Sequence, residues 1–224
     1  MTSKTKYASI VFTIVAALSL AVPPMVSTAD AVTYNIIDCS LSENLNSWGA
    51  CVGTSGADLM RGTSGTDYLL GMGGADKLFG YGGNDYLYGN DGDDVLLDGG
   101  DGNDYILGGA GDDTIEAGLG NDTVYGEAGD DDIDGEGGND TLYGNEGDDD
   151  IVGGSGEDEI RGGAGNDTLT AAAGHHPTDW DDDTLYCDDA GNDSTYSDNV
   201  VYRHAGYDTI NFCSNDDNIT NDES

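Results

Sequence analysis

The chain has 224 residues and is strongly acidic, with 45 Asp and Glu against 6 Lys and Arg and a formal net charge of −39. This charge excludes nucleic acids and anionic membrane surfaces as natural partners, because both repel carboxylates. Two classes of protein remain. One is a disordered acidic segment, since 37 residues are glycine; the other is a folded protein that binds cations.

The first 31 residues have the pattern of a secretory signal peptide. Two lysines precede an uncharged run over residues 7–22, and small residues follow at 27–31. A membrane-spanning helix needs roughly 20 apolar residues, so this run is too short for one. We therefore predict cleavage after Ala29 or Ala31, a secreted, extracellular or cell-surface location, and no membrane insertion.

A nine-residue unit begins at Gly53 and occurs thirteen times in tandem up to Thr170, with one additional residue, Asp98. Position 4 is glycine, position 6 is aspartate and position 8 is aliphatic in every unit, and position 1 is glycine except at Ala117. A disordered acidic chain would not keep this phase over thirteen units. The periodicity therefore predicts an ordered repeat protein.

The residue types within the unit favour a calcium-binding turn followed by a short strand. Ca²⁺ takes six to eight oxygen ligands, and backbone carbonyls converge on one ion only in conformations open chiefly to glycine. In the strand, position 8 points inward and positions 7 and 9 point outward. In the fifth unit this places Leu96 inward and Val95 and Leu97 outward. The additional residue Asp98 is predicted to form a β-bulge that leaves the repeat pattern unchanged.

Position 5 alternates between asparagine and aspartate from Asn84 to Asp148. Odd and even units therefore face different surroundings, as they would on opposite sides of a roll with two units per turn. The alternation continues across Asp98, which supports the interpretation of that residue as an insertion.

The units resemble the RTX, or haemolysin-type, calcium-binding nonapeptide GGxGxDxUx. The resemblance implies an all-β fold, a parallel β-roll that is a calcium-dependent solenoid with two nonapeptide repeats per turn. Each ion would lie between one turn and the equivalent turn two repeats on, so columns of seven and six turns give about eleven Ca²⁺ sites. The metal ligands that it implies, together with backbone carbonyls, are Asp58, Asp67, Asp76, Asp85, Asp94, Asp104, Asp113, Asp122, Asp131, Asp140, Asp149, Asp158 and Asp167.

Two cysteines precede the repeats and two follow them. Three pairings exist in principle, and the placement favours Cys39–Cys51 and Cys187–Cys213, one disulfide at each end, in an oxidising compartment. Solenoids need caps at their ends. We expect a signal peptide over 1–31, an N-terminal cap over 32–52, the β-roll over 53–170, a C-terminal cap of degenerate repeats over 171–213 and a disordered tail over 214–224.

The sequence offers no place for a catalytic domain. About twenty residues separate the signal peptide from Gly53, too few for such a domain, and the C-terminal cap contains no recognisable nucleophile–base pair. We predict a secreted, non-enzymatic calcium-binding repeat protein that folds on binding Ca²⁺ and serves as a structural or adhesive extracellular module. The alternative is a calcium-dependent accessory or partner protein of a separately encoded exported enzyme or surface component.

One of the two predicted sheets is rich in tyrosine. Five alternate repeats carry no charge at their outward positions, and the outward tyrosines are Tyr68, Tyr86, Tyr88, Tyr105, Tyr125 and Tyr143. Two interpretations are open. Tyrosine and threonine suit exposed strands and pair across them, or the uncharged stripe is a docking surface for a protein, a glycan or a second copy of the chain.

Overall fold

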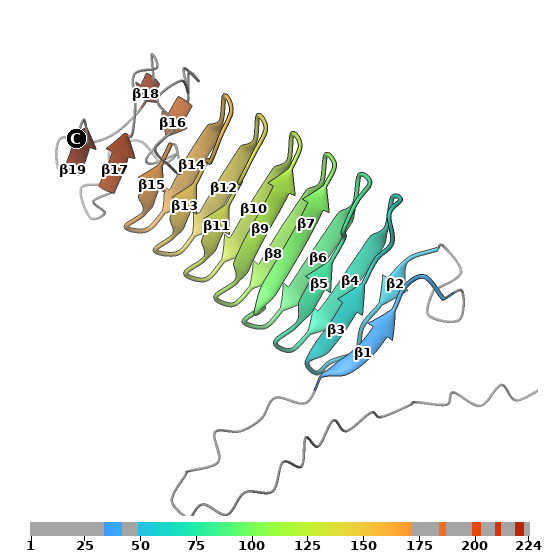
Figure 1. The fold of residues 1–224 in the computed structure, drawn as a ribbon. Coiled ribbons are helices and arrows are strands. Elements are labelled where there is room, and N and C mark those ends of the chain that lie inside the picture. The colour runs from blue at the N-terminus through green and yellow to red at the C-terminus, as the bar shows by residue number, and fades with distance from the viewer. Residues whose placement is uncertain are drawn as a thin grey trace, which may run out of the picture.

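The computed structural model describes residues 34–41, 49–171, 184–186, 199–202, 209–211 and 218–221. The strands in these ranges follow one another as the rungs of a solenoid (Figure 1). This confirms the predicted all-β parallel roll. No helix in the described ranges is long and apolar enough to cross a membrane. The predicted signal peptide and the predicted Cys187–Cys213 disulfide lie outside the described residues.

The described strands form two parallel sheets, and each pairing joins strands that are two apart in the chain. The first sheet, called here the tyrosine sheet, has nine strands in the order β2 (Cys51–Val52), β4 (Tyr68–Gly73), β6 (Tyr86–Asp91), β8 (Tyr105–Ala110), β10 (Thr123–Ala128), β12 (Thr141–Glu146), β14 (Glu159–Ala164), β16 (Thr184–Tyr186) and β18 (Thr209–Asn211). The second, called the opposite sheet, has ten strands in the order β1 (Asn35–Asp38), β3 (Asp58–Arg61), β5 (Lys77–Phe79), β7 (Leu96–Asp101), β9 (Thr114–Leu119), β11 (Asp132–Asp134), β13 (Asp150–Val152), β15 (Thr168–Thr170), β17 (Asn199–Tyr202) and β19 (Asn218–Asn221). One turn of the solenoid therefore contains one strand of each sheet, as the alternation at position 5 predicted.

The hydrophobic core is a narrow column between the two sheets. Each repeat strand contributes one inward aliphatic side chain, and each of these is at most 1 % exposed. The members of the column in the repeats are Met60, Leu69, Leu78, Leu87, Leu97, Ile106, Ile115, Val124, Ile133, Leu142, Ile151, Ile160 and Leu169. A core one side chain thick leaves the turns to supply much of the stability.

The fifth repeat differs from the prediction in its inward residue. Leu97 is fully buried, Leu96 is only partly buried, and Val95 is 42 % exposed. The bulge lies at Val95, since the amides of Val95 and Leu96 both donate to the carbonyl of Asp76, at 2.9 and 3.4 Å. Asp98 is not the inserted residue; it lies in β7 and pairs in register with Phe79.

The physical reason for this shift is the alternation of side chains along a strand. With Leu96 inward, Leu97 would point outward and Asp98 would point toward the core, where a carboxylate is costly. Moving the bulge to the start of the strand buries Leu97 and places Asp98 on the outer face.

Substitution of the two leucines tests this register. Leu97→Ala is expected to lower the free energy of unfolding of the calcium-loaded protein by about 2–5 kcal/mol, because it empties part of the core. Leu96→Ala, the matched control, should cost less than about 1 kcal/mol, because its side chain lies on the outer face. The measurement is urea denaturation at saturating calcium. A larger effect at Leu96 would contradict the bulge at Val95.

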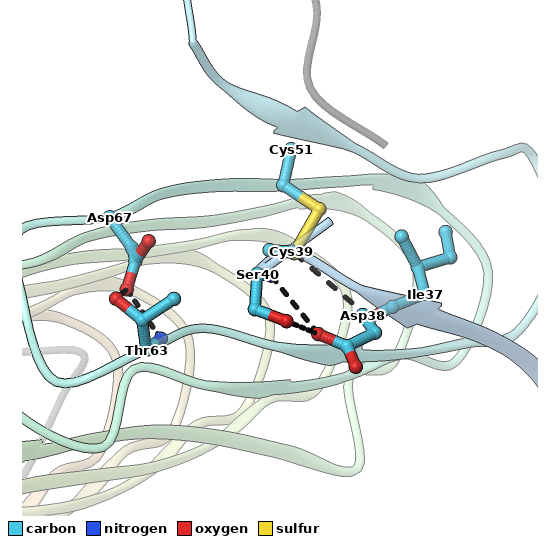
Figure 2. Close-up of a disulfide and its surroundings, with 7 residues drawn as sticks. All are labelled: Ile37, Asp38, Cys39, Ser40, Cys51, Thr63 and Asp67. Atoms are coloured by element: carbon cyan, nitrogen blue, oxygen red, sulfur yellow. Dashed lines mark hydrogen bonds between the residues drawn. A yellow bond between two sulfur atoms is a disulfide. The ribbon is translucent and has the colours of Figure 1, made fainter. Parts of the chain in front are cut away.

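A disulfide closes the first coil. Cys39 directly follows β1 and Cys51 opens β2, and their Cα atoms are 5.6 Å apart (Figure 2). Both cysteines are buried, and Cys51 pairs in register with Leu69 of β4. The Cys39–Cys51 half of the predicted pairing is therefore confirmed.

The C-terminal end differs from the predicted disordered tail over 214–224. Residues 218–221 form β19, which extends the opposite sheet by pairing with β17. Pairing satisfies backbone groups that an open strand edge leaves without partners. The sequence signal was Asp217-Asn218-Ile219-Thr220, which keeps the Asp-x-aliphatic-x end of the repeat.

Candidate metal-binding turns

The thirteen position-6 aspartates line up in two columns, one on each side of the roll. Twelve of them are at most 3 % exposed, and Asp67 is partly buried. Within a column, the amide of each aspartate donates to Oδ1 of the aspartate one coil further on. The distances are 2.7–2.9 Å, as in the pairs Asp104–Asp122 and Asp131–Asp149. In eleven of the thirteen carboxylates, from Asp76 to Asp167, one oxygen thus serves to join successive coils.

The second carboxylate oxygen is the unusual atom of the turn. Oδ2 is buried and accepts no hydrogen bond at Asp76, Asp85, Asp94, Asp104, Asp113, Asp122, Asp131, Asp140 and Asp149. An ionised oxygen buried without a partner loses its hydration and gains nothing in return. A positively charged ligand bound beside these oxygens would offset the cost of burying them.

Backbone carbonyls face the same space as Oδ2. A Cβ placed on Gly108, at position 1 of its repeat, would lie 2.5 Å from Asp113 Oδ2 and 2.7 Å from the carbonyl oxygen of Gly126 in the next coil. The two oxygens therefore border a gap that any side chain would fill. No group of three or more His, Cys, Asp or Glu side chains in the described ranges could bind a metal without help. Backbone carbonyls would therefore supply much of the coordination of an ion bound there.

The shape of the turn depends on two left-handed residues. From the third repeat to the thirteenth, positions 2 and 4 both have positive φ, for example Gly109 at 126° and Gly111 at 129°. Only glycine adopts this conformation without cost, which explains glycine at position 4 from the third repeat to the thirteenth. Where position 2 is not glycine, the left-handed residues are Met72, Tyr81, Asn90, Glu127, Glu136 and Asn145, none of them β-branched.

Burial makes these carboxylates hard to ionise without a cation. Desolvation, reinforced by neighbouring aspartates of the column, raises the pKa of Asp113 to about 8 and that of Asp122 to about 7. A raised pKa means that the fold favours the neutral form, so ionisation at higher pH destabilises the metal-free roll. The positive side chains of residues 49–171 are Arg61, Lys77 and Arg161. These lie on strands rather than in the turns, so an ionised carboxylate in a turn has no positive side chain of these residues beside it.

The family model of the RTX calcium-binding nonapeptide repeat (4 copies) matches residues 52–87, 61–96, 88–115, 96–124, 108–142 and 143–175. The chain belongs to this family. A search of the curated proteins finds no match to the chain. RTX repeats bind Ca²⁺, and the donor set of these turns fits that ion, because Ca²⁺ prefers hard carboxylate and carbonyl oxygens. When bound, calcium supplies the positive charge that the carboxylate ladder lacks.

The structure places all thirteen sequence-predicted aspartates in RTX turns. Two of them, Asp58 and Asp67, accept a hydrogen bond at Oδ2 from the position-2 amide of their own repeat, whereas Oδ2 accepts none in the nine aspartates from Asp76 to Asp149. The structure also gives the position-5 residues a role that the sequence did not reveal. Their side chains accept the amide of the next coil, as in Asn121 to Asn103 at 3.0 Å and Asp148 to Asp130 at 2.9 Å. The alternation of asparagine and aspartate was the available signal.

Proposed function

We propose that this RTX chain is an extracellular, non-enzymatic structural module, and that the β-roll is the folded state of its calcium-loaded form. The observation that carries the proposal is the ladder of buried Oδ2 atoms without hydrogen-bond donors. Because each inter-coil site exists only in the folded chain, the energy of ion binding becomes folding energy. The experiment that tests it is removal of calcium with a chelator, followed by circular dichroism.

Two features support a location outside the cell. The Cys39–Cys51 disulfide persists in oxidising compartments, and residues 1–31 have the pattern of an export signal. Extracellular calcium modules bind the ion with dissociation constants of about 10⁻⁴–10⁻³ M, so the millimolar calcium outside cells would keep the roll loaded. A chain of this kind would fold after export.

The tyrosine sheet favours a second candidate function, calcium-dependent docking of another protein. Tyr68 stacks on Tyr86 with ring centroids 4.6 Å apart, and Tyr125 stacks on Tyr143 at 4.7 Å. Tyr105 links the two pairs, with its ring 6.1 Å from Tyr86 and 5.7 Å from Tyr125. The ladder is continuous, and each stacked ring covers one face of its neighbour. Stacking therefore leaves fewer ring faces for contact with sugars, so a protein partner is favoured over a glycan.

The chemistry around the ladder points to an arginine-bearing partner. Leu107 lies between Tyr88 and Tyr125 in one column, and Gly109 lies between Asn90 and Glu127 in the next. These smaller residues leave a depression that Tyr88 and Glu127 also line. A guanidinium stacks on aromatic rings and pairs with carboxylates. The same column already shows such a contact, since the Arg161 guanidinium lies 5.7 Å from the Tyr143 ring centroid and 4.2 Å from that of Tyr186.

Two basic peptides of equal length and charge, one of arginines and one of lysines, test this docking surface at saturating calcium. The parent chain should bind the arginine peptide about five-fold tighter, as a cation–π contact of about 1 kcal/mol requires. In the double variant Tyr88→Ser, Tyr125→Ser, this preference should disappear. Calorimetry measures the binding.

The matched control changes two outward side chains of the opposite sheet, Phe79→Ser and Val152→Ser, and should keep the preference for arginine. Equal binding of the two peptides by the parent chain contradicts the docking proposal. So does a calcium-dependent dimer, detected by sedimentation, that the tyrosine variant loses, because the occupant would then be a second copy of the chain.

A further inference from the structure

The first two turns of the roll differ from the other eleven. Their position-2 residues are Thr54 and Thr63, and neither lies in the left-handed region. Gly56 and Gly65 at position 4 are likewise not left-handed. β-Branched residues reach left-handed φ only at high cost, so threonine at position 2 blocks the backbone path of the later turns.

The changed backbone gives the aspartate of each turn a partner within its own repeat. The amide of Thr54 donates to Asp58 Oδ2 at 2.6 Å, and the hydroxyl of Thr54 lies 3.0 Å from the same oxygen. Thr63 and Asp67 repeat this arrangement at 2.6 and 2.9 Å (Figure 2). Oδ2 is the oxygen that accepts no hydrogen bond in the nine aspartates from Asp76 to Asp149.

The other oxygen of Asp58 is also engaged. Its Oδ1 accepts a hydrogen bond of 2.9 Å from the side-chain amide of Asn35, in β1 of the first coil. That coil is the one closed by the Cys39–Cys51 disulfide. The N-terminal end of the roll is thus completed by protein donors and a covalent link.

We propose that threonine takes the place of calcium in the first two turns, so that the calcium array begins at the third repeat. The inference rests on the proposed calcium-dependent function and narrows it. Turns with left-handed positions 2 and 4 form five successive pairs in one column and four in the other. The chain then binds nine ions, one between each pair of turns. If all thirteen turns bound calcium, the number would be eleven. Asp58 and Asp67 act as hydrogen-bonded cap residues rather than as metal ligands.

A later turn of the same chain shows what glycine at position 2 does to the backbone. Gly53-Thr54-Ser55-Gly56 and Gly153-Gly154-Ser155-Gly156 differ only at position 2. Gly154 and Gly156 are left-handed, with φ of 104° and 127°. Replacing threonine by glycine in the first turns therefore recreates a four-residue segment that already adopts the later geometry.

The test counts calcium ions per folded full-length chain, by equilibrium dialysis and elemental analysis at saturating calcium. The parent should bind nine ions, and the double variant Thr54→Gly, Thr63→Gly should bind eleven. Asp58→Asn with Asp67→Asn should leave the count at nine, because an asparagine oxygen still accepts the threonine amide. Asp76→Asn, the positive control from the third repeat, should lose at least one ion.

Eleven ions in the parent, or an unchanged count in the threonine variant, would overturn the inference and leave calcium-dependent folding intact. Loss of ions in the variant with Asp58→Asn and Asp67→Asn would overturn it as well, since both aspartates would then be ligands. A parent chain that binds no calcium would instead overturn the proposed function itself.

Discussion

In a calcium chelator the roll is expected to lose nearly all of its strand structure, and millimolar Ca²⁺ should restore it. The core consists of one aliphatic side chain per repeat strand, which is little apolar burial for the number of residues ordered. The ladder aspartates add mutual repulsion, and burial raises the pKa of Asp85 and Asp131 to about 7, so their ionised forms destabilise the metal-free fold. Bound calcium would remove that penalty.

Circular dichroism in chelator and during a calcium titration measures this transition. The midpoint should lie at about 10⁻⁴–10⁻³ M, the range of extracellular calcium modules. Magnesium at the same concentration is the control for ionic strength. Mg²⁺ demands octahedral geometry at about 2.0–2.1 Å and dehydrates reluctantly, so it should not restore the strands. Full strand content in chelator would show that the roll folds without metal.

The second large effect is expected at Asp122, in the middle of the array. Its Oδ1 accepts the amide of Asp104, and its own amide donates to Asp140. Asp122→Asn keeps an oxygen acceptor for the coil-to-coil hydrogen bond and removes only the negative charge. Because each proposed inter-coil site would share its turns with neighbouring coils, the loss should weaken the sites on both sides. We expect the calcium midpoint of folding to rise about ten-fold or more.

Asp58→Asn is the matched substitution at the edge of the array. Its carboxylate is hydrogen-bonded by Thr54 and Asn35. Because an asparagine oxygen still accepts the Thr54 amide and no proposed ion is lost, the calcium midpoint should change by less than about two-fold. Hydrogen exchange should show lost protection on both sides of Asp122 and little change near Asp58. Equal effects of the two substitutions would contradict a roll in which neighbouring turns share ions.

Much of this fold is readable from the sequence because most repeats use the same three short-range constraints. Glycine at position 4 permits a left-handed turn, aspartate at position 6 follows it, and the aliphatic residue at position 8 points inward from a three-residue strand. The two-sided arrangement was readable from position 5, and the first disulfide from the placement of Cys39 and Cys51 beside the first coil.

Three features depended on contacts between coils. In the segment Val95-Leu96-Leu97-Asp98 either leucine suits the core, and the choice followed from where Asp98 would point when β7 paired with β5. β19 required an open edge on β17 to pair with. The periodicity made Asp58 and Asp67 equivalent to the other aspartates, because it describes residue types and not backbone angles. Only the folded turns show that threonine at position 2 keeps φ out of the left-handed region and directs its amide to Oδ2 of the carboxylate. In the nine aspartates from Asp76 to Asp149 that oxygen accepts no hydrogen bond.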